Sequence, residues 1–391
     1  MFNPRTLKVI EISMKIYSSL GSNPYKWKSE CGSFSASTTV TRKFTFFIAV
    51  SHTFFLLCFL IWRLVQHTQK LESNRSFQAI VWLWIWIILM SWSLVTLYNG
   101  WTKKWEIVAL FNGVRLLTAN LEREYPAATM RRVLWKFNII DVHFIAVIWI
   151  VLMYAVAVTL MFSVVPARQQ YFYSLISSSK PDKMDVIFLT FLIFEAYAKT
   201  SQVFMMGTEA FSILPTLLPT AFWMDYFRRI GRNTAPISEK ISIFQKFHLL
   251  ITYYNHAFVT LLPPMLSVLN PTALCVTCCF AAIRFRSFLP IFEYIPFPII
   301  FNNELVVIVV TLLPAAAVYD VSDKLRRHIR NEVNSGSGKV SRKRLATLHA
   351  FGVRIGPIRK VRKIAILMCY NLIANYIFTL LITFPQEKVS R

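Results

Sequence analysis

The chain has 391 residues, of which 55% are hydrophobic and only 16% are charged, and its mean hydropathy is +0.48. A soluble protein of this length needs more polar surface to cover its core, so this composition excludes a soluble globular fold. The net charge of +24 does not indicate a nucleic-acid partner, because the basic residues lie between apolar blocks, where they contact lipid headgroups of a bilayer.

The first segment, residues 1–43, is charged and of mixed composition. It lacks the short apolar core and small-residue cleavage site of a signal peptide. We therefore expect this segment in the cytosol, and we expect the first span to direct insertion into the membrane.

Seven apolar stretches follow, and each predicts a transmembrane helix, since about 20 apolar residues cross the hydrocarbon core. The sixth stretch is short and follows Pro290, Pro296 and Pro298, which leaves its start open. The predicted spans are residues 44–64, 77–98, 143–165, 184–223, 258–283, 304–321 and 364–384.

The Lys and Arg residues predict the orientation of these spans. Of the 43, 32 lie in the first segment and the second, fourth and sixth loops, and 9 lie in the other loops and the carboxyl tail. Positive charge marks the cytosolic side, so we predict a cytosolic amino terminus and an extracellular carboxyl terminus. The glycosylation sequon that begins at Asn74 then falls in an outer loop.

The second span carries Trp82, Trp84, Trp86 and Trp92. The alternate spacing of the first three distributes them round the helix. We expect most of them to face lipid or the membrane interface.

The fourth apolar stretch is too long for a single span. Two spans that turn at Met206-Gly207 would place the most basic loop outside. We therefore predict one helix that continues past Pro215 and Pro219, because proline kinks a membrane helix without necessarily ending it.

Charged and polar residues in two spans are candidates for a ligand cavity. Glu195 and Lys199 lie one turn apart in the middle of the fourth span, and an unpaired charge at that depth is costly, so we predict a mutual ion pair. The pair is either a packing element or the polar floor of a ligand pocket. Asn303 and Glu304, at the outer end of the sixth span, are further pocket candidates.

The sequence contains no signature of catalysis. Cys275, Cys278 and Cys279 have no histidine or acidic neighbour in their span, so we interpret them as small buried hydrophobes rather than a metal site. A Gly-rich phosphate loop and a metalloprotease helix are both missing. We expect no enzymatic activity, no metal and no cofactor.

The seventh span carries one polar stripe, in which Asn371, Asn375, Thr379 and Thr383 recur every four residues. Such a stripe either forms hydrogen bonds between helices of one bundle or faces a water-filled path. The residues alone do not separate these two interpretations.

Four stretches resemble arthropod gustatory receptors, which belong to the insect-type chemoreceptor superfamily together with odorant receptors. They are residues 19–27, 247–255, 349–356 (ending at Gly356) and 370–380. The seventh span of that family carries Thr-Tyr, five apolar residues and Gln-Phe. Here Tyr376 matches the Tyr, Asn375 replaces the Thr, and Ile382 and Thr383 stand at the Gln and Phe positions.

The resemblance implies a ligand-gated, non-selective cation channel in the plasma membrane of sensory neurons. It implies a homo- or heterotetramer around a pore of four seventh spans, lined by the polar stripe or Ile382, and a small-molecule tastant in the outer half of the other spans. By periodicity we expect Thr383 to face the pore more directly than Ile382. The implied regions are 1–43 cytosolic, 44–224 spans one to four, 225–257 cytosolic anchor helix, 258–321 spans five and six, 322–363 basic anchor loop, and 364–391 pore span and outer tail.

Two other classes of membrane protein remain as alternatives. A G-protein-coupled receptor also has seven spans, but its amino terminus is outside, against the charge pattern. Asn270-Pro271 lacks the Tyr that would follow in that class. A secondary transporter usually contains inverted repeats with broken helices in both halves, and the proline-rich second half has no counterpart in the first.

Overall fold

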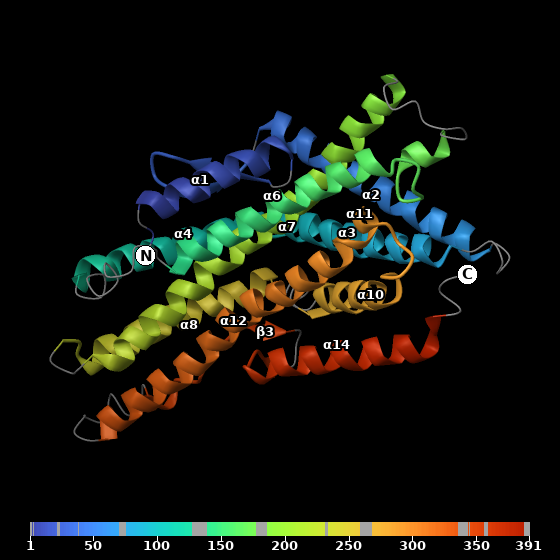
Figure 1. Cartoon of the computed structure of the whole chain (residues 1–391). Coiled ribbons are helices and arrows are strands. Elements are labelled where there is room, and N and C mark those ends of the chain that lie inside the picture. Colours follow the sequence, from blue (N-terminus) through green and yellow to red (C-terminus); the bar gives the residue numbers. More distant parts are fainter. Residues whose placement is uncertain are drawn as a thin grey trace.

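The computed structural model describes residues 2, 4–21, 24–37, 39–69, 76–126, 139–176, 186–230, 234–258, 268–334, 343, 345–355 and 359–386. These residues form a long bundle of helices with two small antiparallel strand pairs (Figure 1). The fold is therefore mostly helical, as predicted, and the strand pairs depart from the all-α expectation. The elements are α1 (Pro4–Ser19), β1 (Tyr25–Lys28), β2 (Ser33–Ala36), α2 (Val40–Thr68), α3 (Phe77–Thr102), α4 (Lys104–Glu124), α6 (Ile139–Val164), the 3-10 turn η2 (Phe172–Leu175), α7 (Val186–Arg229), α8 (Ile237–Phe258), α10 (Asn270–Arg284), α11 (Ile291–Tyr294), α12 (Pro296–Asn334), β3 (Arg354–Ile355), β4 (Arg359–Lys360) and α14 (Ile364–Thr383).

Five helical stretches of the described residues are long and apolar enough to cross a membrane. They are α2, α3, Ile145–Val164 of α6, Ile291–Asn334 (which joins α11 to α12) and α14. These stretches coincide with predicted spans one, two, three, six and seven. The fourth and fifth predicted spans fall on α7 and α10, which do not meet the same criteria.

Helix α7 is one continuous helix of 44 residues, and Pro215 and Pro219 lie inside it without ending it, as predicted. At about 1.5 Å per residue it is roughly twice as long as the hydrocarbon core is thick. There is no turn at Gly207. Instead, a Cβ atom at Gly207 would lie 2.7 Å from the Tyr17 hydroxyl and 3.1 Å from Cγ2 of Val151, so glycine lets α1 and α6 approach α7 closely.

The helix bounds in this region differ from the predicted limits of spans five and six. Helix α12 begins at Pro296 rather than at residue 304, because Pro296 and Pro298 occupy the first turn, where proline costs no hydrogen bond. The predicted fifth span begins at Phe258, but that residue ends α8, and α10 begins at Asn270. Residues 259–267 lie outside the described part of the chain.

The segment before α2 folds onto α4, a helix within the predicted second loop. The side-chain amide of Asn112 on α4 donates to the carbonyl of Phe34 at 2.9 Å and accepts from its backbone N–H at 3.0 Å. Arg115 of α4 donates to the carbonyls of Cys31 and Gly32 in the β1–β2 turn. Gly32 has a φ of +53°, which favours glycine at this position.

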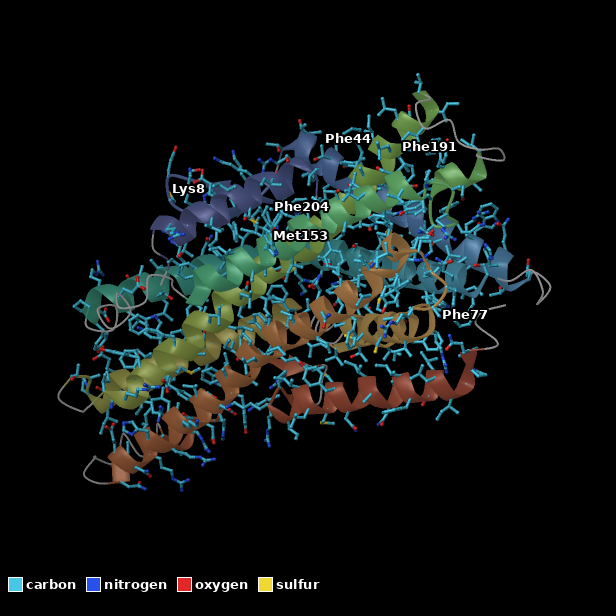
Figure 2. All side chains as sticks on the ribbon, viewed as in Figure 1. Lys8, Phe44, Phe77, Met153, Phe191 and Phe204 are labelled. Atoms are coloured by element: carbon cyan, nitrogen blue, oxygen red, sulfur yellow. The ribbon has the colours of Figure 1, made fainter. Side chains whose placement is uncertain are left out.

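One end of the bundle consists of α4, α8 and the carboxyl-terminal parts of α7 and α12 (Figure 1). Lys240 of α8 is fully buried there, and its Nζ donates to the Glu332 carboxylate of α12 at 3.0 and 3.2 Å and to the Ile230 carbonyl at 2.9 Å. Nitrogen-tipped side chains gather round the same end of α12 in Figure 2. Helices α7 and α12 cross the expected region boundaries at residues 224 and 321 without a break.

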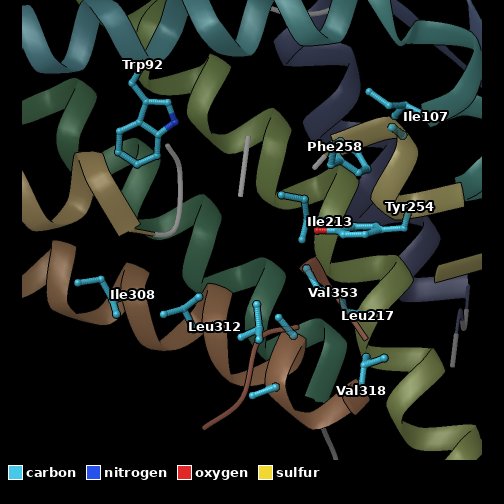
Figure 3. Packing of buried hydrophobic residues seen from close by; sticks show 14 of the residues in the cluster. Trp92, Ile107, Ile213, Leu217, Tyr254, Phe258, Ile308, Leu312, Val318 and Val353 are labelled. Atoms are coloured by element: carbon cyan, nitrogen blue, oxygen red, sulfur yellow. The ribbon is translucent and has the colours of Figure 1, made fainter. Parts of the chain in front are cut away.

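Buried apolar side chains form a continuous core along the bundle (Figure 3). This core includes Trp92 of α3, Leu217 of α7, Phe258 of α8 and Leu312 of α12. It also includes Val353, which lies in the segment between α12 and α14. That segment is therefore packed against the long helices.

Candidate functional site

A cavity of about 340 Å³ lies between α3, α6, α7 and the first half of α12. Its walls are almost entirely apolar, and α6 supplies one side with Val147, Val151, Val158 and Met161. Volume and lining are those of a site for a small organic molecule, since such sites are concave, mostly apolar and carry few polar groups.

Three tryptophans of α3 line the cavity, which makes our expectation that they face lipid wrong. Trp82, Trp86 and Trp92 are buried, whereas Trp84 is half exposed. Trp82 and Trp86 are four residues apart and so share a face of the helix. Trp92 lies about 80° round the helix axis from Trp82 and lines the cavity from beside that face. The ring of Trp82 also packs on Phe297, with 4.6 Å between centroids.

The polar side chains on the cavity wall come mainly from α12. Asn303 and Glu304, which the sequence singles out, both line it, and Tyr154 of α6 lies opposite. The Tyr154 hydroxyl is close enough to interact with both side chains. Yet this hydroxyl and Oε2 of Glu304 form no hydrogen bond of regular geometry with any described residue. Sequence reasoning missed Tyr154, because its span is apolar throughout.

An acidic residue with a basic partner also lines the cavity. Glu293 of α11 forms an ion pair with Arg168. The same carboxylate accepts a hydrogen bond from Nε2 of Gln78 on α3 at 2.7 Å. These contacts fasten the start of α3 and the segment after α6 to α11.

Glu195 and Lys199 form the predicted ion pair, but neither residue lines the cavity. Glu195 also accepts from the backbone N–H of Phe172 at 2.9 Å. Nζ of Lys199 lies 4.3 Å from the ring centroid of Trp86 and 4.1 Å from that of Tyr171, within cation–π range. Trp86 therefore separates this charged cluster from the cavity.

The polar stripe of α14 faces away from its own bundle. Asn371, Asn375, Thr379 and Thr383 are exposed, and α14 packs on α10 and α12 through its opposite face. The two threonine hydroxyls donate to the carbonyls four residues earlier, at 2.9 and 2.8 Å. Hydrogen bonding between the described helices of this one chain therefore does not account for the stripe.

The other candidate residues in or near the seventh span are either exposed or outside the described part of the chain. Tyr376 is 54% exposed and Ile382 is 81% exposed. Gly356 lies outside the described residues. Cys369, in the same helix, is buried on the face toward the bundle, and Cys275 and Cys278 are buried in the core.

The segment ahead of α14 is fastened to α8 and α12. Asn255 of α8 donates to the Gly352 carbonyl at 3.0 Å and accepts from the Arg354 N–H at 3.0 Å. Ser322 of α12 donates to the Phe351 carbonyl at 2.6 Å and accepts from its N–H at 3.2 Å. Helix α12 thus contacts the cavity near its start and this segment further along.

No protein-family model matches the chain, and no curated protein matches it by sequence. The structure is similar to that of the insect olfactory receptor OR5 from Machilis hrabei in complex with eugenol, with a TM-score of 0.58 and 12% identity over 97% of this chain and 98% of the receptor. A second structure of that receptor gives a TM-score of 0.57 and 12% identity over 96% and 97% of the two chains. The chain therefore has the fold of this insect olfactory receptor along nearly its whole length.

Proposed function

We propose that the chain is a chemosensory receptor that acts as a ligand-gated, non-selective cation channel. The exposed polar stripe of α14 is the observation that carries this proposal. In a lone chain in a bilayer, Asn371 and Asn375 would face hydrocarbon, where polar side chains are costly. Four copies of the chain, with α14 around a central axis, would turn these residues toward a water-filled path.

The cavity is the proposed site of the ligand. The Machilis hrabei receptor is in complex with eugenol, a small organic molecule, and the apolar cavity between α3, α6, α7 and α12 suits a ligand of similar size. We propose a tastant as the ligand, cations as the permeating species, and the plasma membrane of sensory neurons as the location, with a homo- or heterotetramer as the assembly.

Helix α12 supplies a physical route from ligand to pore. Asn303 and Thr311 line the cavity, and Ser322 holds the segment that leads into α14. A ligand that binds more tightly to one position of α12 than to another would shift α12, and with it that segment, toward the favoured position. Gating requires such a difference in affinity between two states.

Currents in cells that express the chain alone, challenged with a panel of small tastants, test the proposal. Val158→Phe should fill the cavity and abolish or strongly reduce the response, because Val158 is a buried cavity residue. Val156→Phe is the matched control, because Val156 is exposed on the same helix and is absent from the cavity lining. Ligand uptake without any current would instead favour a secondary transporter.

A further inference from the structure

One acidic side chain in the cavity has no cationic partner in the part of the chain that the structure describes. Glu304 is only 4% exposed, and its Oε2 forms no hydrogen bond with any described residue. The other two buried glutamates among these residues are each paired, Glu195 with Lys199 and Glu293 with Arg168. Among the described residues, each buried glutamate therefore has a Lys or Arg partner except Glu304 on the cavity wall.

The other described residues that line the cavity do not supply a cation for Glu304. No Lys, Arg or His is among the described residues that line it. A carboxylate in an apolar site is costly unless a cation and hydrogen bonds compensate it. An entering cation with N–H donors would supply both to Glu304.

The neighbouring side chains suit the same ligand chemistry. Trp82, Trp86 and Trp92 line the cavity, and Tyr154 adds a fourth ring beside Glu304. Aromatic faces attract cations, most strongly where water is excluded. The aliphatic side chains of α6 would contact the apolar body of such a ligand.

The chain already uses this arrangement once to hold an ammonium group. Nζ of Lys199 lies 3.0 Å from a carboxylate oxygen of Glu195 and above the rings of Trp86 and Tyr171. The Lys199 side chain is 1% exposed, and its ammonium is held by this carboxylate, the two rings and the Gln170 carbonyl at 3.4 Å. Trp86 stands between this cluster and the cavity, where Glu304 is the corresponding carboxylate without its ammonium.

We propose that the cavity binds a small organic amine in its protonated form, with the ammonium group on Glu304 and an apolar body between α3 and α6. This inference rests on the proposed function, since it names the ligand class of the proposed receptor cavity. A wholly apolar pocket gives no reason for a protonated amine to bind more tightly than its neutral analogue. Tighter binding of the amine therefore distinguishes the proposed site from such a pocket.

Equilibrium binding to the purified full-length protein in lipid nanodiscs tests the inference. The probes are 2-phenylethylamine and 2-phenylethanol, which share one skeleton and differ in the charged head group. The wild type should bind the amine about tenfold or more tightly than the alcohol, as expected for a charged hydrogen bond in a desolvated site. Glu304→Gln, which keeps the size of the side chain, should remove most of this preference.

Glu106→Gln is the matched control, because it removes a carboxylate that lies on α4 and is absent from the cavity lining. It should leave the preference for the amine unchanged. The inference is overturned if the wild type fails to bind the amine, if it binds amine and alcohol equally, or if Glu304→Gln keeps the full preference. Should Glu304→Gln fail to fold, the comparison of the two probes on the wild type still decides.

The same experiment separates this inference from the proposed channel. Amine binding that depends on Glu304, without current in cells, would contradict the channel and support the ligand class. Currents evoked by neutral tastants, without amine binding, would support the channel and overturn the ligand class.

Discussion

Lys199 and Glu195 lie one turn apart on α7, with Nζ of the lysine 3.0 Å from Oε2 of the glutamate and both side chains 1% exposed. The contacts round the pair are unequal. Glu195 also accepts a hydrogen bond from the Phe172 N–H, whereas Lys199 lies over the Trp86 and Tyr171 rings and donates to the Gln170 carbonyl at 3.4 Å. The pair therefore joins α7 to α3 and to the turn that follows α6.

Removing one member of this pair should be strongly destabilising, because it leaves a buried charge uncompensated. We expect Lys199→Met and Glu195→Gln each to cost about 3–5 kcal/mol, with the double variant recovering much of that loss. Lys199→Met should be the worse single change, since the aromatic rings still stabilise the lysine in Glu195→Gln. Thermal unfolding of purified variants and their surface expression measure these effects. Additive losses would mean that the two side chains do not interact energetically.

The charge pattern predicts a cytosolic amino terminus. An epitope tag at residue 1 should be reached by antibody only after permeabilisation, and a tag after residue 391 should be reached on intact cells. A tag at residue 1 that is accessible on intact cells would contradict this orientation. Glycosylation at Asn74 is a weaker readout, because this residue lies close to the start of α3 and outside the described part of the chain.

A histidine of α8 packs against the segment ahead of α14. His248 of α8 stacks on Phe351, with 5.1 Å between ring centroids. Burial lowers the pKa of His248, and the positive charges of Lys360, His349 and Arg354 lower it further. The neutral imidazole is therefore the form that the folded protein favours.

Acidification should loosen this contact. Between the ordinary histidine pKa of about 6.5 and the lower pKa in the folded protein, the unfolded chain binds more protons, so the free energy of unfolding falls as pH falls. We expect His248→Phe to keep the stacking and to flatten the pH dependence of thermal unfolding below about pH 6.5. An unchanged slope would show that His248 does not titrate differently in the folded state.

Asn255 provides a test of coupling between cavity and pore. Asn255→Ala removes both hydrogen bonds to Gly352 and Arg354, which are part-buried and exposed, and the loss of such a hydrogen bond costs about 0.5–1.5 kcal/mol. We expect ligand binding to stay within about twofold while the concentration for half-maximal current shifts, because Asn255 is not among the residues that line the cavity. Thr252→Val, at an exposed position on the same helix, should change neither quantity. Equal shifts in binding and current would contradict a coupling role.

Much of the helix pattern follows from local sequence. The distribution of basic residues predicts α7 as one helix that continues past Pro215 and Pro219, and the structure agrees. The start of α12 was not predicted, because a proline-rich stretch is typical of a helix break. Here Pro296 and Pro298 instead occupy the first turn of the helix. The strand pairs were missed, because their stability comes from contacts such as Asn112 with Phe34, which no local pattern encodes.

The candidate cavity depends more on tertiary packing. Asn303, Glu304 and the pairing of Glu195 with Lys199 could be singled out, because polar groups within apolar spans are conspicuous. The roles of Trp82 and Trp86 could not be assigned, since only the neighbouring helices decide which tryptophans are covered. Their four-residue spacing, which places both rings on one face of α3, is the sequence signal for a shared environment.

The exposure of α14 changes which residue we expect to face the proposed pore. Cys369 and Ile373 mark the face toward the bundle, and Ile382, at 81% exposure, lies on nearly the opposite side at about 100° per residue. Thr383 is displaced from that side by about 100°. Periodicity alone favours Thr383, whereas the packing of α14 favours Ile382, the residue at the Gln position of the gustatory receptor pattern.

A ring of four carboxylates should therefore act more strongly at residue 382 than at residue 383. In a tetramer each substitution appears four times around one narrow path, so Ile382→Glu would concentrate cations at the mouth and raise cation conductance or change cation selectivity. Thr383→Glu should do less. Single-channel conductance and reversal potentials in mixed cations measure both effects. A larger change in conductance or selectivity for Thr383→Glu than for Ile382→Glu would contradict this ranking and support the one from periodicity.

Cysteine scanning from residue 371 to residue 384 tests the path itself. The background should lack Cys31 and Cys58, which are exposed, and keep Cys369, which is buried toward the bundle and serves as an internal unreactive control. If α14 lines water, a water-soluble thiol reagent should block current at positions spaced three to four residues apart, with Asn371, Asn375 and Ile382 among them. Because the opposite face packs on α10 and α12, substitutions at Ile373 should stay inert in the same channels. Channels that conduct while every position stays unreactive would place the ion path outside α14.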